Sequence, residues 1–271
     1  MSPVTWDVAG FPGSTYSLIL ALALAICAGL AMTVFEARRR SDLGGGESAP
    51  GGRERGIEMY ALDAGLVTAV GGLMGGRALS VALWWSHFST RPAEIATLTQ
   101  GGLAWPGALL GGSLALALYA VHRRRSFPAL ADILAPGAAL GQAVGWLGCT
   151  LSGCGYGLAT GGPWAYTLPD VYGIPALRHP AQAYLGAWSA LITLLLMLWP
   201  RPRALSGGVA LLYLFLTSLG DFLVEFTRGD ETLYIGSLRY SQWVGASLAL
   251  LAALGLLHLR RRPALAKGAP Q

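Results

Sequence analysis

Seven apolar stretches of about 20 residues each constrain the fold of this chain more than any other feature. A helix of that length crosses the hydrocarbon core of a bilayer, which is about 30 Å thick. Of the 271 residues, 54% are hydrophobic and only 12% are charged, whereas a soluble globular domain carries about 25% charged residues. The sequence therefore predicts an all-α integral membrane protein, a single seven-span domain over residues 1–271. The predicted spans lie near residues 16–35, 61–84, 102–121, 133–154, 183–199, 207–224 and 240–259.

Basic residues are distributed unevenly between alternate loops of this arrangement. Short loops rich in lysine and arginine stay in the cytoplasm, so the pattern predicts an N-terminus outside and a cytoplasmic C-terminus. The net charge of +5 is explained by loops that face an anionic leaflet, and we expect no nucleic-acid partner. Fourteen of the nineteen basic residues lie on the predicted cytoplasmic side, namely Arg38, Arg39, Arg40, Arg53, Arg55, Arg123, Arg124, Arg125, Arg201, Arg203, Arg260, Arg261, Arg262 and Lys267.

The remaining segments carry weaker signals. The first apolar run lacks a preceding basic region and is about 20 residues long, which favours a retained span over a cleaved signal peptide. The Gly- and Ser-rich residues 41–52 predict a flexible linker. Pro136 and several glycines interrupt the run at 133–154, so this segment is either a kinked helix or a partly re-entrant one buried in protein. The loop 155–178 is too apolar for a disordered segment and predicts a small extracytoplasmic cap or a membrane-interface element.

Glycines recur at four-residue spacing in the second, third and fourth predicted spans. Small residues at this spacing let helix backbones approach closely, so we expect these spans to pack tightly. Room for a lipid tail is the alternative interpretation. The glycines concerned are Gly71, Gly72, Gly75, Gly76, Gly107, Gly111, Gly137, Gly141 and Gly145.

Three cysteines, Cys27, Cys149 and Cys154, are too few for a disulfide framework. Cys149 and Cys154 lack the further Cys or His ligands that a zinc site needs. We therefore expect no metal and no cofactor. Apolar packing is the leading interpretation of Cys149 and Cys154, and a reactive thiol is the alternative.

Polar and aromatic residues gather at the predicted outer ends of the spans, which predicts a polar cavity open to the outer leaflet. Arg77 lies inside the second span, where an isolated charge is costly. It belongs either to a buried ion pair or to a phosphate site, since the guanidinium fork can hold phosphate oxygens bidentately. Asp221, Glu225 and Arg228 share one helix face. Glu225 and Arg228 can pair locally, and one of the two carboxylates must be protonated or paired with a cation from another span, for which Arg77 lies at a suitable depth.

Histidine is the usual proton carrier near neutral pH, and His87 and His179 lie on the predicted outer side. For each of them, a hydrogen-bonding residue at the interface is the leading interpretation, and a catalytic role is the alternative.

Several short motifs, in order along the chain, resemble the prolipoprotein diacylglyceryl transferase family. The resemblance covers nearly the whole chain and implies the same seven spans. The motifs are TYS at residues 15–17, GGR at 75–77, GGL at 101–103, Asp132 with AP at 135–136, GWLGC at 145–149 through GCGYG at 153–157, RHPAQAY at 178–184, and VEF at 224–226 with Arg228.

The resemblance implies a bacterial enzyme of the cytoplasmic (inner) membrane. Such an enzyme moves a diacylglyceryl group from phosphatidylglycerol, an anionic phospholipid, to the thiol of the lipobox cysteine in a prolipoprotein signal peptide. It implies His179, Glu225 and Tyr16 as catalytic candidates. For substrate binding it implies Arg77 and Arg228 at the phosphate, together with Gly148, Gly157, Cys149 and Cys154.

The chain departs from the family pattern at four positions. Trp146 replaces an arginine, Cys149 an asparagine, Pro106 a histidine, and Asp221 a second arginine. A lipid-binding paralogue that keeps the fold without the ordinary reaction is therefore the alternative function. A small-molecule transporter is disfavoured because the sequence shows no internal repeat.

Overall fold

The computed structural model describes residues 5–8, 11–14, 51–96, 103–170, 172–199 and 206–261, which are mostly helical. Five helices in this part of the chain are long and apolar enough to cross a membrane: Tyr60–Leu83, Phe127–Leu151, Ala181–Leu198, Gly208–Thr227 and Tyr240–Arg261. The prediction of a helical membrane protein is confirmed at that level. The predicted span 16–35, with Tyr16 and Cys27, lies outside the described residues.

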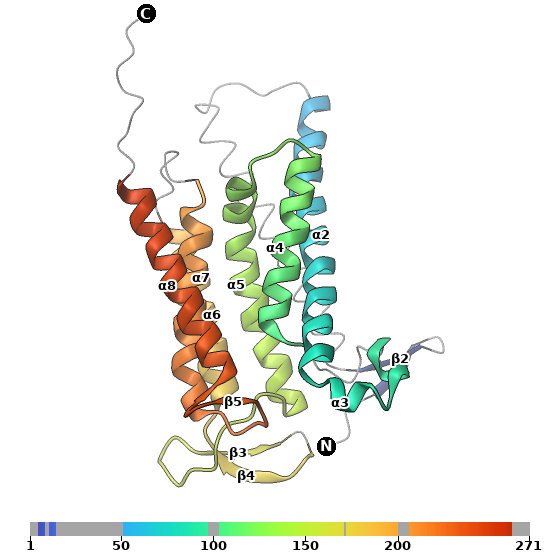
Figure 1. Cartoon of the computed structure of the whole chain (residues 1–271), viewed down its shortest axis with the longest axis vertical. Helices are drawn as coiled ribbons and strands as arrows, with labels where there is room; N and C mark the ends of the chain where they lie inside the picture. Colours follow the sequence, from blue (N-terminus) through green and yellow to red (C-terminus); the bar gives the residue numbers. More distant parts are fainter. Residues whose placement is uncertain are drawn as a thin grey trace, which may run out of the picture. The chain divides into compact units, whose positions relative to one another are not determined.

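The chain divides into two compact units, residues 2–137 and residues 138–271. The first contains strands β1 (Thr5–Val8) and β2 (Phe11–Ser14), helices α2 (Gly51–Leu83), α3 (Trp85–Phe88) and α4 (Trp105–His122), and the short 3-10 helix η1 (Pro92–Ala96). Helix α5 (Phe127–Ser152) begins in this unit and ends in the second. Figure 1 labels these elements.

Helix α2 begins earlier than the apolar run predicts. Gly51 and Gly52, expected in a flexible linker, start the helix, and Arg53 and Arg55 lie in its first turns. The prediction that these two arginines lie in a loop is therefore wrong. The run from 53 to 59 contains arginine, glutamate and methionine, which favour helix and extend α2 ahead of the apolar segment that begins at Tyr60.

Glycines bring α2 and α4 into backbone contact. A Cβ atom built on Gly111 would lie 2.8 Å from the Cα atom of Gly75, and one on Gly75 would lie 2.7 Å from the Cα atom of Gly111. The expected close packing is confirmed for these two helices. In α5, by contrast, a Cβ on Gly145 would meet no atom of the described residues within 4 Å, so the packing expectation is wrong at that position within this part of the chain.

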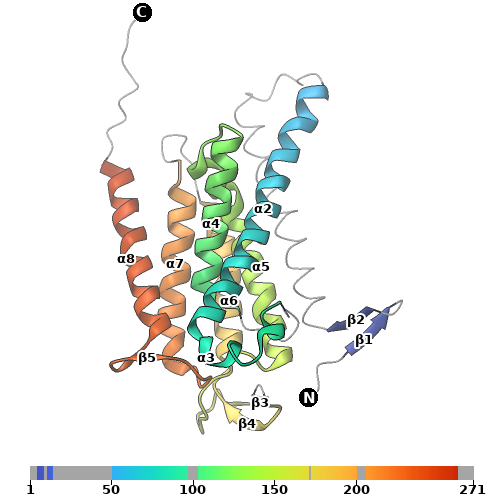
Figure 2. The same cartoon turned by 45° about the vertical axis from the view of Figure 1, so that its right-hand side comes forward.

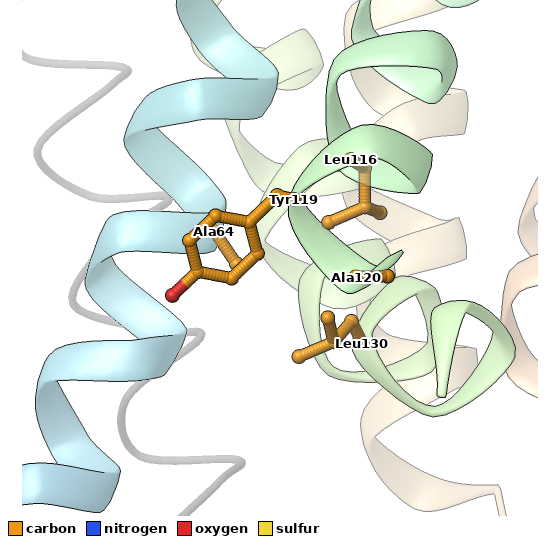
Figure 3. Close-up of a cluster of buried hydrophobic side chains, with 5 residues drawn as sticks. All are labelled: Ala64, Leu116, Tyr119, Ala120 and Leu130. Carbon is orange, nitrogen blue, oxygen red and sulfur yellow. The ribbon is translucent and has the colours of Figure 1, made fainter. Parts of the chain in front are cut away.

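Beside this contact, a buried apolar cluster joins α2, α4 and the start of α5. It consists of Ala64, Leu116, Tyr119, Ala120 and Leu130 (Figure 3). The hydroxyl of Tyr119 donates a hydrogen bond of 3.3 Å to the backbone oxygen of Tyr60. Helix α5 runs unbroken from Phe127 to Ser152 with Pro136 inside it, so the re-entrant alternative for this segment is wrong.

Among its described residues, the second unit adds three long helices and two β-hairpins to the end of α5. The helices are α6 (Ala181–Leu198), α7 (Gly208–Val224), which continues into the 3-10 helix η2 (Glu225–Thr227), and α8 (Tyr240–Arg261). Strands β3 (Tyr166–Pro169) and β4 (Pro175–Arg178) form one antiparallel hairpin, and β5 (Tyr234–Ile235) and β6 (Leu238–Arg239) form the other. Both hairpins lie at the end of the unit where α7 ends and where α6 and α8 begin (Figures 1 and 2).

Small residues also set the spacing of these helices. The Trp188 indole N–H of α6 donates a 2.9 Å hydrogen bond to the Leu216 carbonyl of α7, and its ring covers Gly220. A Cβ on Gly245 of α8 would lie 3.1 Å from the carbonyl oxygen of Ser218. Helix α7 therefore contacts both neighbours closely along its last turns, which fixes the position of the residues that follow it.

The glycine contact between α2 and α4 predicts a strong effect of one added methyl group. Gly111→Ala should lower the free energy of unfolding by about 1–3 kcal/mol, because its Cβ would overlap the backbone of α2. Gly65→Ala in α2 is the matched control, since its Cβ would lie at an ordinary 3.6 Å from Leu134. Thermal unfolding in detergent measures both, and equal stability of the two variants would contradict the contact.

Candidate active site

Glu225 lies where α7 tightens into η2, and it is 4% exposed. Arg228 follows three residues later in an extended backbone conformation, which turns its side chain back toward the helix end. Its Nη1 donates a 2.6 Å hydrogen bond to Glu225 Oε1. The predicted local pairing of Glu225 and Arg228 is therefore confirmed.

Arg239 supplies a second cation to the same carboxylate. It ends β6 immediately before α8, is 4% exposed, and places its Nε 2.6 Å from Glu225 Oε2. Its backbone N–H donates a 2.9 Å hydrogen bond to Gln242 Oε1, within the first turn of α8. The cation that reaches Glu225 from beyond α7 is therefore Arg239, in the strand directly before α8.

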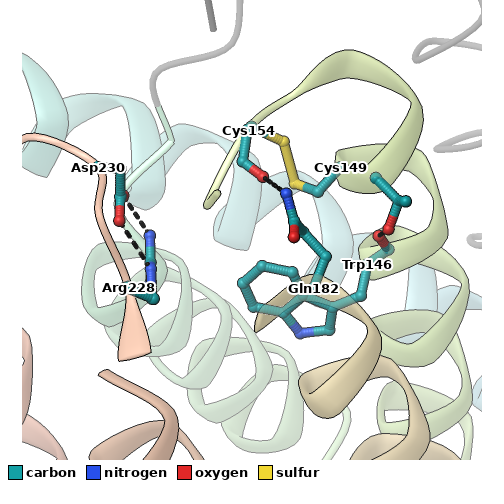
Figure 4. Close-up of a disulfide and its surroundings, with 7 residues drawn as sticks. Trp146, Cys149, Cys154, Gln182, Arg228 and Asp230 are labelled. Atoms are coloured by element: carbon teal, nitrogen blue, oxygen red, sulfur yellow. Dashed lines mark hydrogen bonds and ion pairs between the residues drawn. A yellow bond between two sulfur atoms is a disulfide. The ribbon is translucent and has the colours of Figure 1, made fainter. Parts of the chain in front are cut away.

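Asp230 completes an ionic cluster, which we define as Glu225, Arg228, Asp230 and Arg239. Arg228 Nε donates to Asp230 Oδ1 at 2.9 Å, and Arg228 Nη2 donates to Asp230 Oδ2. Arg239 Nη2 donates to both the side chain and the backbone oxygen of Asp230, each at 2.9 Å. Figure 4 shows the fork between Arg228 and Asp230.

The two carboxylates and two guanidiniums of the ionic cluster balance in charge, which a buried cluster requires. Burial alone would lower the pKa of Arg228, but the carboxylates of Asp230 and Glu225 outweigh it and raise that pKa above its ordinary value. Arg228 is therefore a fixed cation. Asp221 lies one turn before Glu225 on α7 and is also buried, so an extra acidic side chain stands beside the balanced cluster.

Cys149 and Cys154 form a disulfide (Figure 4). The prediction of apolar packing cysteines without a disulfide is wrong at this pair. Cys149 is in the last turn of α5, and the turn that follows, with Gly153 in a left-handed conformation (φ 77°), brings Cys154 back to it. A sequence rule based on the number of cysteines misses such a local link between neighbours.

The disulfide closes residues 149–154, and other contacts hold Cys154 and the residues that follow it. The Gln182 side-chain amide of α6 donates a 3.1 Å hydrogen bond to the Cys154 carbonyl. The Tyr156 carbonyl accepts a 2.8 Å hydrogen bond from the backbone N–H of Gly229. The Tyr156 ring lies under the guanidinium of Arg178, with 4.7 Å between the Arg178 carbon Cζ and the ring centroid. Burial raises the pKa of the Tyr156 hydroxyl, with a smaller contribution from Asp170.

Gly157 lies between two of the predicted site residues. Its backbone forms an isolated antiparallel bridge with Arg228, and a Cβ there would lie 2.8 Å from the Cβ of His179. Only glycine fits at this close approach. Gly157 therefore brings His179 and Arg228 of the ionic cluster close to one backbone position.

His179 is held between aromatic rings. Its ring stacks on Trp164, with 6.3 Å between ring centroids, and meets the edge of Tyr184 at 6.4 Å. In the part of the chain that the structure describes, its buried Nδ1 has no hydrogen-bond partner. An imidazole nitrogen with no partner is available to bind or accept a proton.

Trp146 borders the ionic cluster from the side of α5. The Arg228 Cζ lies 6.0 Å from the centroid of its ring, close enough for a cation–π contact. Gly155, at φ 62°, approaches the ring from one side, and Gly186 of α6 lies near the Trp146 Cβ. Gly148, two residues further along α5, is buried. An aromatic face therefore stands beside Arg228.

Arg77 belongs to the other unit and contacts backbone oxygens there. Its Nε donates to the Ile95 carbonyl at 2.9 Å, its Nη2 donates to the Glu94 carbonyl, and its guanidinium lies over the ring of Phe88. His87 is half exposed and pairs with the Glu94 carboxylate at 2.8 Å, which lowers the pKa of that carboxyl. This pairing is the ordinary polar role that the sequence favoured for His87.

No group of three or more His, Cys, Asp or Glu side chains suited to a metal ion occurs among the described residues. The ionic cluster adds Asp230 and Arg239 to the residues proposed from sequence. The sequence signal for Arg239 was its position on the predicted outer side, directly before the last span.

Taken together, the fold and these side chains define a multi-pass membrane protein with a buried, charge-balanced cluster next to a histidine. The model of the prolipoprotein diacylglyceryl transferase family matches residues 3–258. The chain therefore belongs to this family.

Its curated relatives include three bacterial phosphatidylglycerol–prolipoprotein diacylglyceryl transferases. The protein of Synechococcus elongatus is 35% identical over 219 residues, covering 76% of this chain and 75% of the relative. That of Trichormus variabilis is 34% identical over 215 residues, with 74% and 76% covered. That of Symbiobacterium thermophilum is 33% identical over 223 residues, with 78% and 82% covered.

Proposed function

We propose that this protein transfers a diacylglyceryl group from phosphatidylglycerol to the cysteine thiol of a prolipoprotein signal peptide. The family and the names of its relatives support the reaction. The observation that carries the proposal for this chain is the position of Arg228, a cation that meets Glu225, Gly157 and Trp146 at one place.

In this reaction the cysteine sulfur attacks the carbon of the diacylglyceryl group that carries the phosphate. A C–S bond forms while the C–O bond to the phosphate breaks, and glycerol phosphate leaves with the electron pair. The thiol proton must pass to a base. Because negative charge develops on the departing phosphate, stabilising that charge is the main electrostatic task. Arg228 performs it in this proposal, and Arg77 is the second candidate cation.

The contacts of Glu225 and His179 indicate which of these two residues is the base that accepts the thiol proton. Each carboxylate oxygen of Glu225 already lies 2.6 Å from a guanidinium nitrogen, so both oxygens are engaged with arginines. The Nδ1 of His179 is buried and has no partner within the described residues. His179 therefore serves as the base, and Glu225 positions Arg228. Tyr16, which lies outside the described residues, stays a catalytic candidate.

A lipid-binding protein without transferase activity is the second candidate function. The observation that favours it is the replacement of charged or proton-carrying family residues by Pro106, Trp146 and Asp221. In particular, Asp221 places an acidic side chain one turn from Glu225, where the family pattern has a cation. Transfer activity in cells distinguishes the two functions.

The proposal includes seven spans in the cytoplasmic membrane, an N-terminus outside and a cytoplasmic C-terminus. Residues 155–178, which contain the β3–β4 hairpin, form an extracytoplasmic cap over a polar cavity that opens to the outer leaflet. The disulfide supports this orientation, because disulfides persist in oxidising compartments and are rare in the cytosol. It lies at the end of α5 that the arginine distribution assigns to the outside.

Complementation of a bacterium depleted of its own transferase tests the function. The wild-type chain should restore lipidation of the acceptor cysteine, and His179→Ala should reduce the rate by about 100-fold or more, as expected for loss of a general base. His87→Ala is the matched control and should leave the rate unchanged. Absence of rescue by wild-type protein that reaches the membrane would favour the lipid-binding alternative.

Thiol labelling of intact cells tests the orientation, with Cys27→Ser to remove the third cysteine. Cys149 and Cys154 should react with a membrane-impermeant maleimide only after treatment with a reductant. In the control Cys154→Ser, Cys149 should react without reductant. Labelling that needs permeabilised cells would place this end of α5 in the cytoplasm and refute the orientation.

A further inference from the structure

Asp230 occupies the fork of Arg228 as a phosphate group would. Its two carboxylate oxygens accept hydrogen bonds from Arg228 Nε and Nη2, one oxygen for each nitrogen. These two nitrogens form the edge of the guanidinium that binds carboxylate and phosphate oxygens bidentately. A phosphodiester that binds this edge must therefore displace Asp230.

We propose that Asp230 is an internal competitor for the phosphate of the lipid, holding Arg228 in the empty site and releasing it when the phosphate binds. This inference rests on the proposed function in taking the ligand to be the phosphodiester of an anionic phospholipid. It adds a residue that sets the affinity of the site, one absent from the motifs that resemble the family.

The burial of the two side chains indicates which carboxylate, that of Asp230 or that of Glu225, the phosphate displaces from Arg228. The side chain of Asp230 is 22% exposed and lies in the segment between η2 and β5, whereas that of Glu225 is 4% exposed at the end of a helix. Glu225 has one arginine on each oxygen, so its release from Arg228 would disturb both pairs. Displacing Asp230 from Arg228 therefore costs less free energy than displacing Glu225.

Arg239 remains a hydrogen-bond partner of Asp230 after the phosphate displaces Asp230 from Arg228. Its Nη2 donates to Asp230 Oδ1 and to the Asp230 backbone oxygen, each at 2.9 Å. These bonds do not involve Arg228. The displaced carboxylate therefore keeps a cation partner, which avoids the high cost of an unpaired charge in a buried place.

The charge balance of the ionic cluster determines whether Asp230 strengthens or weakens binding of the phosphate. Two carboxylates already neutralise two guanidiniums in the ionic cluster, so a bound phosphodiester adds one uncompensated negative charge. Asp230 therefore weakens binding of the lipid phosphate. It also favours departure of glycerol phosphate after transfer, because it returns to the fork that the product occupies.

Binding measurements on the detergent-solubilised full chain test this competition. Short-chain phosphatidylglycerol and free glycerol phosphate are titrated separately by calorimetry, to distinguish recognition of the lipid from recognition of any phosphate. Asp230→Asn should lower the Kd for phosphatidylglycerol about tenfold, which corresponds to about 1.4 kcal/mol. A matching gain for glycerol phosphate would show that the phosphate alone is recognised, and a gain confined to the lipid would show that its tails are needed to seat it.

Glu231→Gln is the matched control, because it removes the same charge from the adjacent, exposed residue. It should change the Kd by no more than about twofold, as expected for a screened surface charge. Asp230→Ser replaces Asp230→Asn if the amide variant does not fold. Adding Arg228→Gln to Asp230→Asn should abolish the gain.

An unchanged or weaker affinity in folded Asp230→Asn would overturn the competition, as would a gain that persists without Arg228. A separate transfer assay with a lipobox peptide distinguishes this outcome from failure of the proposed function. Tighter binding in Asp230→Asn without any transfer by the wild-type protein would refute the transferase and leave Asp230 as the competitor.

Discussion

The pairing of Glu225 with two arginines is the interaction on which the site depends. Arg228 comes from the segment after η2, and Arg239 from the strand before α8. Removing one partner of a buried ion pair typically costs about 3–5 kcal/mol, because it leaves a charge without compensation. This one carboxylate therefore ties the end of α7 to the start of α8 and fixes the side chain that faces the proposed phosphate.

The glycine-rich segment after α5 also contributes to the site that contains Arg228. Its disulfide and the Gln182 hydrogen bond hold Cys154, and the missing side chain of Gly157 lets Arg228 and His179 approach one backbone position. Trp146 gives Arg228 an aromatic face where the family pattern has another cation. The chain thus lacks two arginines of the family pattern, and both arginines of its ionic cluster are paired with carboxylates.

The sequence predicted those features that depend on local pattern. Apolar runs placed α6, α7 and α8 within a few residues of their observed bounds, and three-residue spacing placed Arg228 on Glu225. Glycine spacing predicted the contact between α2 and α4. The roles of Asp230 and Arg239 were not predictable in this way, because they depend on how an irregular segment and a two-residue strand fold back on a helix end. The disulfide was missed for a related reason, since it depends on the turn at Gly153.

A double-mutant cycle between Glu225 and Arg239 tests whether the ion pair between them holds the site together. Glu225→Gln, Arg239→Gln and the double variant are compared by denaturant unfolding in detergent. Each single variant should be destabilised, because a buried charge is left unpaired, and the double variant should be less destabilised than the two effects combined, by about 1–3 kcal/mol. Effects that simply add would contradict the claim that this pair holds the site together.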